Sequence, residues 1–328
     1  SDLNAQGYLM SYPDAFRPMG DKISSDDFAA YKTAAVSYED ELYGVPFDSG
    51  VAALFYRTDY LSEIGYTEED MQDLTWEEYL SLGEKLKTKG HMLQTYNPND
   101  IAEFQIMLQS AGKWFTNEKG EADFIDNAAL EECYSIFKQL NEADYTKVVS
   151  DWTEFAGAIN SGEVACVLRG CWMTSTLMAE ESQSGKWALA PIPKMNVEGA
   201  THYSNQGGSS WFVLNDSANS EIAADFLAKT FGSSTELYNT LLKEKSIIGT
   251  FLPATDVEAY EETSEFFSNQ QVNKLLGDWM TKIPAVDTGA FSAEAQNSLV
   301  SVTPSILEGE DLKENLATAE EQFEQSIQ

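Results

Sequence analysis

The stretch of sequence that decides the fold is YGVPFDSGVAALFYRTD, at residues 43–59. A turn with glycine and proline opens it, and the run of small and apolar residues at 51–56 is long enough for a buried strand. Phe47 and Asp48 stand where the turn meets this strand. An aromatic ring can stack on a sugar and a carboxylate can accept its hydroxyl protons, so the stretch predicts a ligand site at the mouth of a core strand. A buried strand after an ordinary turn is the alternative.

Size and composition indicate a folded globular protein with one large domain or two. The chain has 328 residues, of which 43% are hydrophobic and 12% aromatic. Its 20 basic and 54 acidic residues give a net charge of −34. This charge repels phosphate backbones, so no nucleic-acid partner is expected; a solvated acidic coat or attraction of a cationic ligand would explain it. No apolar run approaches the roughly 18 residues that span a bilayer, and no signal peptide is visible.

Cysteine and histidine usage predicts no metal site and no cofactor. Cys133, Cys166 and Cys171 are too few for a disulfide framework. The last two lie in one apolar segment and are expected to be small core residues. His91 and His202 alone cannot build a histidine-rich transition-metal site. No Cys–His nucleophile signature is present, so no catalytic residue is predicted.

Capping signals predict where several helices begin in a chain that alternates helical and strand-like segments, which is typical of an α/β fold. Thr75 with Glu78 forms a capping box. Asp126, Ser220 and Ser233 are the predicted N-caps of three further helices. The residues predicted to face the core from these three helices are Leu130, Cys133, Phe137 and Leu140, then Ile222, Phe226 and Leu227, then Leu237 and Leu241.

Short apolar runs predict the strands. Besides residues 51–56, the candidates are residues 164–168, 187–191 and 211–214. Residues 311–328 are predicted to form a final amphipathic helix. No low-complexity linker divides the chain, so any two lobes are expected to be joined by strands that cross between them.

A second informative segment is SGEVACVLRGCW, at residues 161–172. Glycine turns bound a buried strand, and Trp172 begins a new helix at its carboxyl end. Open α/β sheets bind ligands at such strand ends. The indole of Trp172 can stack on the apolar face of a pyranose. Core packing is the alternative for this side chain.

The order of several motifs resembles the extracellular solute-binding proteins of bacterial carbohydrate ABC importers, the maltose-binding-protein-like family 1. Each motif alone is weak, and the resemblance rests on their common order along residues 43–255. The motifs are YGVPFD at 43–48, TWEEYLSLGEKLKTKG at 75–90, the segment at 161–172, APIP at 190–193, GGSSW at 207–211 and NSEIAADFL at 219–227.

The resemblance implies a two-lobed periplasmic-binding-protein fold of the second topological type, with a ligand cleft between the lobes and hinge strands that let them close. The implied segments are 1–49 in the first lobe, 50–205 in the second, 206–252 returning to the first and 253–328 in the second. The first hinge crossing is expected at residues 49–51. Family members carry strands and helices ahead of the YGVP turn that this chain does not show, so the first lobe is expected to lack its N-terminal part.

The resemblance also implies a set of cleft residues. They are Trp172, Phe47, Asp48, Asn205, Gln206, Trp211 and, from a looser match, Phe291 or Trp279, and Phe251 is a hinge or cleft candidate. Arg169 lies at a strand end, where it could donate two hydrogen bonds to a ligand or join an ion pair. Trp152 either lines the cleft or packs in the core. Trp114 is expected to pack in the core.

The leading hypothesis is a non-catalytic protein that binds a carbohydrate and delivers it to the membrane permease of an ABC importer. We expect the carbohydrate to be an oligosaccharide. A polyamine or other cation bound through acidic and aromatic cleft residues is one alternative. A glycoside hydrolase with two carboxylates facing each other across the cleft is another. The resemblance further implies an extracellular or periplasmic monomer, a lipoprotein anchored through an N-terminal lipid that this chain does not include.

Overall fold

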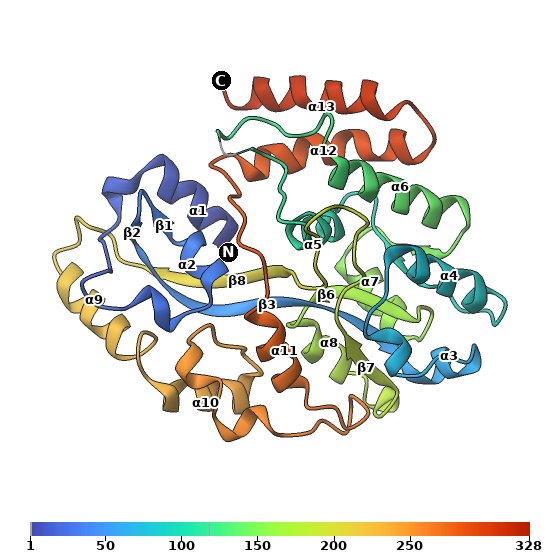
Figure 1. Ribbon diagram of the computed structural model, residues 1–328, viewed down its shortest axis with the longest axis horizontal. Coiled ribbons are helices and arrows are strands. Elements are labelled where there is room, and N and C mark those ends of the chain that lie inside the picture. The colour runs from blue at the N-terminus through green and yellow to red at the C-terminus, as the bar shows by residue number, and fades with distance from the viewer. Residues whose placement is uncertain (1, 118) are drawn as a thin grey trace.

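One long strand, β3 (Gly44–Arg57), organises the whole molecule. The computed structural model describes residues 2–117 and 119–328, with side chains from residue 5 onward. In Figure 1, β3 runs across the full width of the chain, from the part that holds the N-terminal helix to the part that holds most of the other helices. Its 14 residues all lie within the decisive stretch, so the predicted strand is confirmed, and it extends further toward the N-terminus than the apolar run at 51–56.

β3 changes partners along its length. Its first half pairs antiparallel with β8 (Asn205–Phe212), from Gly44 opposite Phe212 to Val51 opposite Asn205. Its second half lies between β6 (Cys166–Gly170) and β7 (Trp187–Ala190), again antiparallel. The register between β3 and β8 shifts twice, after Pro46 and after Ser49. These irregularities bend the pair where it passes between the two parts of the molecule.

Helices cover both faces of the sheet formed by β6, β3 and β7. Alternate residues of β3 enter different cores, as the two-residue period of a strand requires. Ala52, Leu54 and Tyr56 join the core on one face, whereas Val51, Ala53 and Phe55 join the core on the other. The helices of the first face are α3 (Thr58–Glu63), α4 (Trp76–Lys87), α5 (Ala102–Ser110), α6 (Ala128–Glu142), α12 (Ser292–Leu307) and α13 (Leu312–Ser326). Those of the second are α7 (Trp152–Asn160), α8 (Met173–Met178) and α11 (Val272–Met280).

A third, smaller core surrounds the first half of β3. It includes Val45, Val213 and Phe251 together with one side of α9 (Ser220–Lys229) and α10 (Thr235–Lys245). The elements that lie beside it in Figure 1 are α1 (Asp2–Ser11), α2 (Ala30–Ala35), β1 (Ser37–Tyr38) and β2 (Glu41–Leu42). Two short strands remain, β4 (Gln94–Tyr96) and β5 (Thr146–Val148), which pair in parallel in the larger part. The segment boundaries expected for the lobes stay a prediction.

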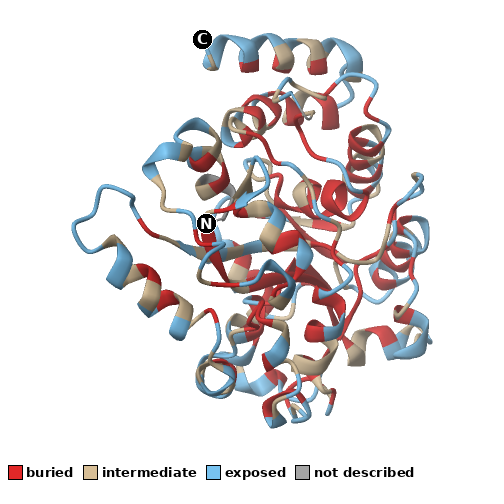
Figure 2. Ribbon diagram, turned by 60° about the vertical axis from the view of Figure 1, so that its left-hand side comes forward, coloured by how far each residue is buried: buried red, intermediate tan, exposed pale blue. Residues whose placement is uncertain are grey.

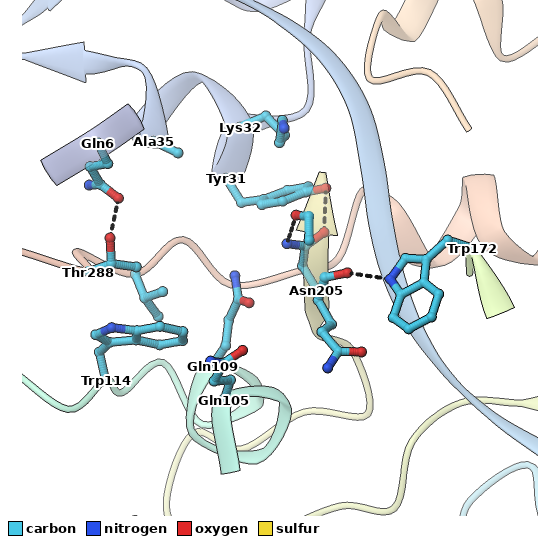
Figure 3. Close-up of a pocket in the computed structure, with 13 residues that line it drawn as sticks. Gln6, Tyr31, Lys32, Ala35, Gln105, Gln109, Trp114, Trp172, Asn205 and Thr288 are labelled. Carbon is cyan, nitrogen blue, oxygen red and sulfur yellow. Dashed lines mark hydrogen bonds between the residues drawn. The ribbon is translucent and has the colours of Figure 1, made fainter. Parts of the chain in front are cut away.

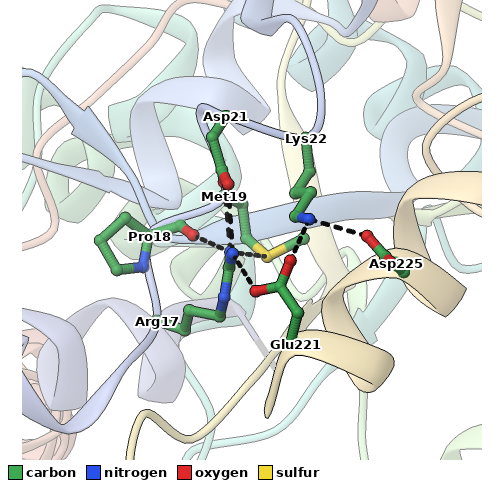
Figure 4. Close-up of polar contacts among 7 residues, drawn as sticks. All are labelled: Arg17, Pro18, Met19, Asp21, Lys22, Glu221 and Asp225. Carbon is green, nitrogen blue, oxygen red and sulfur yellow. Dashed lines mark hydrogen bonds and ion pairs between the residues drawn. The ribbon is translucent and has the colours of Figure 1, made fainter.

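Ion pairs attach α9 to the loop that follows α1. Arg17 contacts Glu221 at 2.8 Å and Asp21 at 3.1 Å. Lys22 contacts Asp225 at 2.8 Å and also Glu221, so the two basic residues share one acceptor (Figure 4). The carboxylates are largely exposed, and pairs of this kind contribute little stability individually. Their network fixes which side of α9 faces the loop.

The predicted helices are present, but some of the residues that cap them differ from those predicted. The capping box of Thr75 and Glu78 is present, and Asp311 caps the last helix. The predicted cap Asp126 is wrong, because Asn127 accepts the first backbone N–H bonds while Asp126 takes a left-handed conformation with φ of 59°. The cap of α10 is Ser234. In each wrong prediction the observed cap is the neighbour of the predicted one, and both side chains can accept a hydrogen bond. Residue type alone therefore does not decide which of the two caps the helix.

The predicted core face of α9 is partly wrong. Leu227 is buried, but Ile222 and Phe226 are 70% and 59% exposed. The ion pairs through Glu221 and Asp225 hold this helix by a different side. Figure 2 shows the resulting alternation of exposed and buried residues along the helix, in contrast to the continuous burial of the central sheet. Helical periodicity therefore identified an apolar face without identifying what it packs against.

Candidate functional site

A cavity of about 290 Å³ lies between the two parts of the molecule, beside the strands that cross between them. It is enclosed by helix α1 and helix α2 on one side, and by α5 and the loops at Trp114 and Trp172 on the other. The lining residues are Gln6, Tyr31, Lys32, Ala35, Gln105, Gln109, Trp114, Trp172, Asn205, Gln206, Gly207, Val286 and Thr288. Figure 3 shows Trp114 and Trp172 at opposite sides of this space, with Gln109 and Asn205 between them.

Trp172 is held at the end of β6 by contacts with β8. Its Nε1–H donates to the backbone oxygen of Gln206 at 3.1 Å. The side chain of Gln206 in turn accepts a hydrogen bond from the backbone N–H of Gly170 at 2.9 Å. Gly170 is required here, because a Cβ at this position would lie 2.4 Å from the Trp172 Nε1 and 2.5 Å from the Gln206 oxygen. The indole therefore has a fixed edge, while 42% of the residue stays exposed.

Asn205 connects the cavity to the crossing point of β3. Its Oδ1 accepts from the backbone N–H of Gly50 at 2.9 Å and from the hydroxyl of Tyr31 at 3.3 Å. Its Nδ2 donates to the backbone oxygen of Gly207 at 2.8 Å. The Tyr31 hydroxyl also bonds to Ser49. A ligand in the cavity would thus contact a side chain that is bonded to both crossing strands.

Two glutamines from α5 form the polar floor of the cavity. Gln105 and Gln109 are four residues apart, so they share one face of the helix. Gln105 Nε2 donates to Gln296 at 2.5 Å, and Gln109 Nε2 donates to the backbone oxygen of Pro284 at 3.3 Å. These bonds fix the orientation of each amide group. Each amide carries two donors and an acceptor with two lone pairs, so capacity for a ligand remains.

The remaining polar groups come from the walls. Thr288 donates to Gln6 of α1 at 2.5 Å, and Trp114 donates from its indole N–H to Ser292 at 2.7 Å. Lys32 is buried and donates to the backbone oxygen of Ser209 at 3.0 Å. No aspartate or glutamate is among the residues that the structure places in the cavity wall. The site therefore combines three aromatic rings with five uncharged amides and one ammonium group.

Sequence reasoning placed Trp172, Asn205 and Gln206 at a ligand cleft, and the structure brings these three together in the cavity. It did not find Tyr31, Gln6 or the two glutamines of α5. Those glutamines had a readable signal, since they form an i, i+4 polar pair on a helix that is otherwise largely apolar. Trp114, expected in the core, is indeed buried and also lines the cavity.

Phe47 and Trp211, expected at the cleft, lie away from this cavity. They contact each other with ring centroids 5.6 Å apart, and Trp211 also stacks on Phe231 at 5.0 Å. Phe47 faces Phe231 edge to face at 5.0 Å. Both belong to an aromatic cluster of the smaller core. Neither residue is among those that line the cavity.

Four more expected cleft residues lie elsewhere. Asp48 is half-buried on β3, opposite Ser209 of β8. Phe251 is buried and stacks on Tyr238 with centroids 5.7 Å apart. Trp279 is buried in α11, within the core under the sheet, and Phe291 lies at the start of α12. Cavity contact by these residues is not observed, and their role in binding stays a prediction.

Arg169 and Trp152 lie next to the cavity rather than in its wall. Arg169 is buried and contacts Glu103, with Asp100 at 3.5 Å. Burial of Glu103 raises the pKa of its carboxyl, although the guanidinium opposes this shift. Trp152 is 52% exposed, and its ring centroid is 5.9 Å from that of Trp172. The ion-pair alternative for Arg169 is thus the one with structural support.

The described residues form no group of three or more His, Cys, Asp or Glu side chains suited to a metal ion. The three cysteines are buried, and burial raises the pKa of Cys171 to about 12, which keeps it a thiol. None of the helices in the described ranges is long and apolar enough to cross a membrane.

Comparison with known proteins identifies relatives over the whole chain. Residues 2–272 match the family of bacterial extracellular solute-binding proteins. The chain is 40% identical over all 328 residues to a lactose-binding protein of Rhizobium radiobacter, of which it covers 78%. It is also 23% identical over 307 residues, 88% of this chain, to an arabinooligosaccharide-binding protein of Halalkalibacterium halodurans, of which it covers 66%.

Solved structures share the fold. The chain aligns over 99% of its length with an extracellular solute-binding protein of family 1, at a TM-score of 0.84 and 16% identity, covering 84% of that chain. An ABC-transporter-associated binding protein from B. animalis subsp. lactis, solved with β-1,6-galactobiose, aligns over 99% at a TM-score of 0.74 and 20% identity, with 82% of it covered. The two-lobed α/β fold expected from the sequence is confirmed. The chain belongs to the bacterial extracellular solute-binding proteins.

Proposed function

We propose that this protein binds a neutral saccharide, with a disaccharide as the unit that fills the cavity, and presents it to the permease of an ABC importer. The observation that carries the proposal is the composition of the cavity wall, in which Trp114, Trp172 and Tyr31 accompany five primary amides. Flat aromatic faces suit the apolar faces of sugar rings. Amide groups both donate and accept, which matches hydroxyl groups that do the same.

The size of the cavity supports a small saccharide. Its volume of about 290 Å³ is near the lower end of the range for small-molecule sites. The similarity to a lactose-binding protein at 40% identity makes lactose the first ligand to test. Because two other relatives are arabinooligosaccharide-binding proteins, pentose-containing saccharides are the second class of ligand to test.

The charge of the cavity argues against a polyamine or another cation as the ligand. Such a ligand needs carboxylates, and the described residues that line the cavity offer none. The same wall holds no carboxylate pair of the kind a glycoside hydrolase requires. We therefore propose binding without catalysis. We also propose that the protein acts as a monomer outside the cell and is attached to the cell surface through a lipid.

Isothermal titration calorimetry with lactose, galactose, arabinose oligosaccharides and maltose tests this function. We expect at least one disaccharide to bind with a Kd of about 10 μM or tighter, and spermidine to give no heat. Intrinsic tryptophan fluorescence should change in the same titration, because Trp114 and Trp172 line the site. A folded protein that binds none of these sugars, or that binds spermidine instead, would overturn the proposal.

A further inference from the structure

Helix α2 is attached to the smaller core that surrounds the first half of β3. Phe28, just ahead of the helix, packs on Phe251 with ring centroids 5.4 Å apart, and both residues belong to that core. The backbone N–H of Ala29 donates to the backbone oxygen of Thr250 at 3.0 Å. Because these contacts anchor the start of α2, the helix belongs to the smaller part of the molecule.

Tyr31, on this helix, reaches out of the smaller part. It belongs to the core on the second face of the central sheet, together with Val51 and Ala53 of β3. Its hydroxyl bonds to the hydroxyl of Ser49 on β3. It also donates to the Oδ1 of Asn205 on β8 at 3.3 Å (Figure 3). Tyr31 and Ser49 are buried, so one hydroxyl shielded from water connects the smaller part to both crossing strands.

The two strands are irregular where this hydroxyl meets them. The register between β3 and β8 shifts between Ser49 and Val51, so that two residues of β8 face the single residue Gly50. The backbone N–H of Gly50 donates to the side chain of Asn205 at 2.9 Å. A Cβ on Gly50 would lie 2.1 Å from the backbone oxygen of Gln206, so the strands approach closely here. Such a bulge disrupts the ladder and is a place where a strand pair bends.

The hydroxyl bonds exist in an arrangement in which both parts of the molecule line the cavity. Tyr31 and Ala35 of α2 stand on one side of the cavity, and Gln109 and Trp114 stand on the other. Hydrogen bonds weaken steeply when their distance or angle changes. A bend at Gly50 that moves α2 relative to the crossing strands therefore breaks the bonds of the Tyr31 hydroxyl.

We infer that the Tyr31 hydroxyl is a latch at the hinge. It stabilises the arrangement in which both parts line the cavity, and it thereby sets the sugar affinity without a bond of its own to the sugar. A group that favours the binding-competent arrangement raises the apparent affinity by raising the population of that arrangement. Tyr31 and Ser49 are thus positioning residues. The effect on affinity rests on the proposed function, whereas the latch itself needs no ligand.

Distances between the two parts, measured without sugar, test the latch itself. Spin labels on Lys229→Cys in α9 and Glu321→Cys in α13 report the separation, since both positions are exposed and the three native cysteines are buried. Addition of Tyr31→Phe removes only the hydroxyl. We expect it to shift the distances measured by double electron–electron resonance toward longer values. An unchanged or shorter distribution would overturn the inference.

Lactose titrations of Tyr31→Phe, Ser49→Ala and the double variant separate a latch from a direct contact. Ser49 is not among the residues that line the cavity, so it has no contact with the sugar. We expect each single substitution to weaken lactose binding about fivefold. The double variant should lose about as much as either one, because both substitutions remove the same bond. Unchanged affinity in Ser49→Ala beside weaker binding in Tyr31→Phe would mean that the hydroxyl binds the sugar directly, which overturns the latch.

Tyr134→Phe is the matched control. Tyr134 is also buried, and its hydroxyl bonds to Thr303 at 3.1 Å in a part of the larger core that does not line the cavity. This substitution should change neither the distances nor the lactose affinity. If it changes both as Tyr31→Phe does, a general loss of stability is responsible and the latch is overturned. If the unsubstituted protein binds no sugar, the proposed function fails, and the distances without sugar still decide the latch.

Discussion

Trp172 and Trp211 are exposed to nearly the same extent, 42% and 41%, and both lie close to a glycine in strands that flank β3. Their surroundings differ. Trp172 lines the cavity and donates its indole N–H to the backbone of Gln206. Trp211 lies on Phe231 and Phe47 in an aromatic cluster of the smaller core. Nearly equal exposure therefore accompanies two different sets of contacts.

From this difference we propose that an aromatic side chain available to a ligand is recognised by what holds its edge. Trp172 lines the cavity, and its edge is fixed by a hydrogen bond and by the absence of a side chain at Gly170. Trp211 has one face covered by rings with the same apolar character as its own. A ring that is fixed only at its edge leaves its face available for stacking on a ligand. A ring whose face packs on other side chains buries that face and so stabilises the fold.

The largest expected effect concerns the buried ion pair of Arg169 and Glu103, at the strand that ends next to Trp172. Arg169→Met leaves Glu103 buried without its guanidinium partner. We expect the free energy of unfolding to fall by about 3 kcal/mol at neutral pH, because an uncompensated buried charge is strongly destabilising. Urea denaturation followed by circular dichroism measures the change.

The destabilisation caused by Arg169→Met should increase as the pH rises. Burial already raises the pKa of Glu103, and loss of Arg169 raises it further. A carboxyl with a raised pKa in the folded state contributes stability below its unfolded pKa and loses it as pH rises through the folded pKa. The deficit should therefore be smaller at pH 4 than at pH 8. The double variant Arg169→Met with Glu103→Leu should recover most of it, and failure to do so would mean that packing, not charge, is responsible.

The second prediction compares the two tryptophans directly. Trp172→Ala should weaken sugar binding about 100-fold, equivalent to about 2.7 kcal/mol, because it removes a stacking face and opens the cavity to water. Titration calorimetry with the best disaccharide measures it. Thermal unfolding without ligand should change little, since the residue is already half exposed. A large loss of thermal stability would instead mark Trp172 as a core residue.

The sequence predicted the part of this site that depends on local order. The segment 161–172 placed a tryptophan at a strand end, and the family resemblance implied that Asn205 and Gln206 lie at the cleft. These predictions succeed because a turn glycine, a buried strand and a helix start are consecutive in the chain. The capping box at Thr75 succeeded for the same reason.

The parts that failed depend on contacts between distant segments. Gln6, Tyr31 and Gln109 meet in the cavity only because β3 and β8 cross beside it, and no local signal connects them. Trp211 was expected at the cleft from the family resemblance, but its ring packs on Phe47 and Phe231, where β8 pairs with the first half of β3. Register is set by pairing across 160 residues or so of chain, which local patterns do not record.

The third prediction alters the edge that distinguishes Trp172. Gly170→Ala places a Cβ 2.4 Å from the indole Nε1 and 2.5 Å from the Gln206 oxygen, closer than packed atoms tolerate. We expect about 2 kcal/mol of destabilisation and a displaced indole, visible as a shifted fluorescence maximum and weaker sugar binding. Gly157→Ala is the matched control, because nothing lies within 4 Å of its added carbon. Equal effects of the two substitutions would show that the indole edge is not special.

The smallest effect is expected for Trp211→Ala. Its ring covers Phe47 and Phe231, so its removal exposes apolar surface in the smaller core and should lower the free energy of unfolding by about 1 kcal/mol, less than a fully buried aromatic would. Disaccharide affinity should stay within about twofold, since the cavity wall is untouched. Unfolding in urea and calorimetry on the same sample measure both. If the sugar affinity falls as far as for Trp172→Ala, the exposed fraction of a tryptophan would predict sugar binding better than the fixation of its edge. The two indoles have nearly the same exposed fraction but differ in what fixes them.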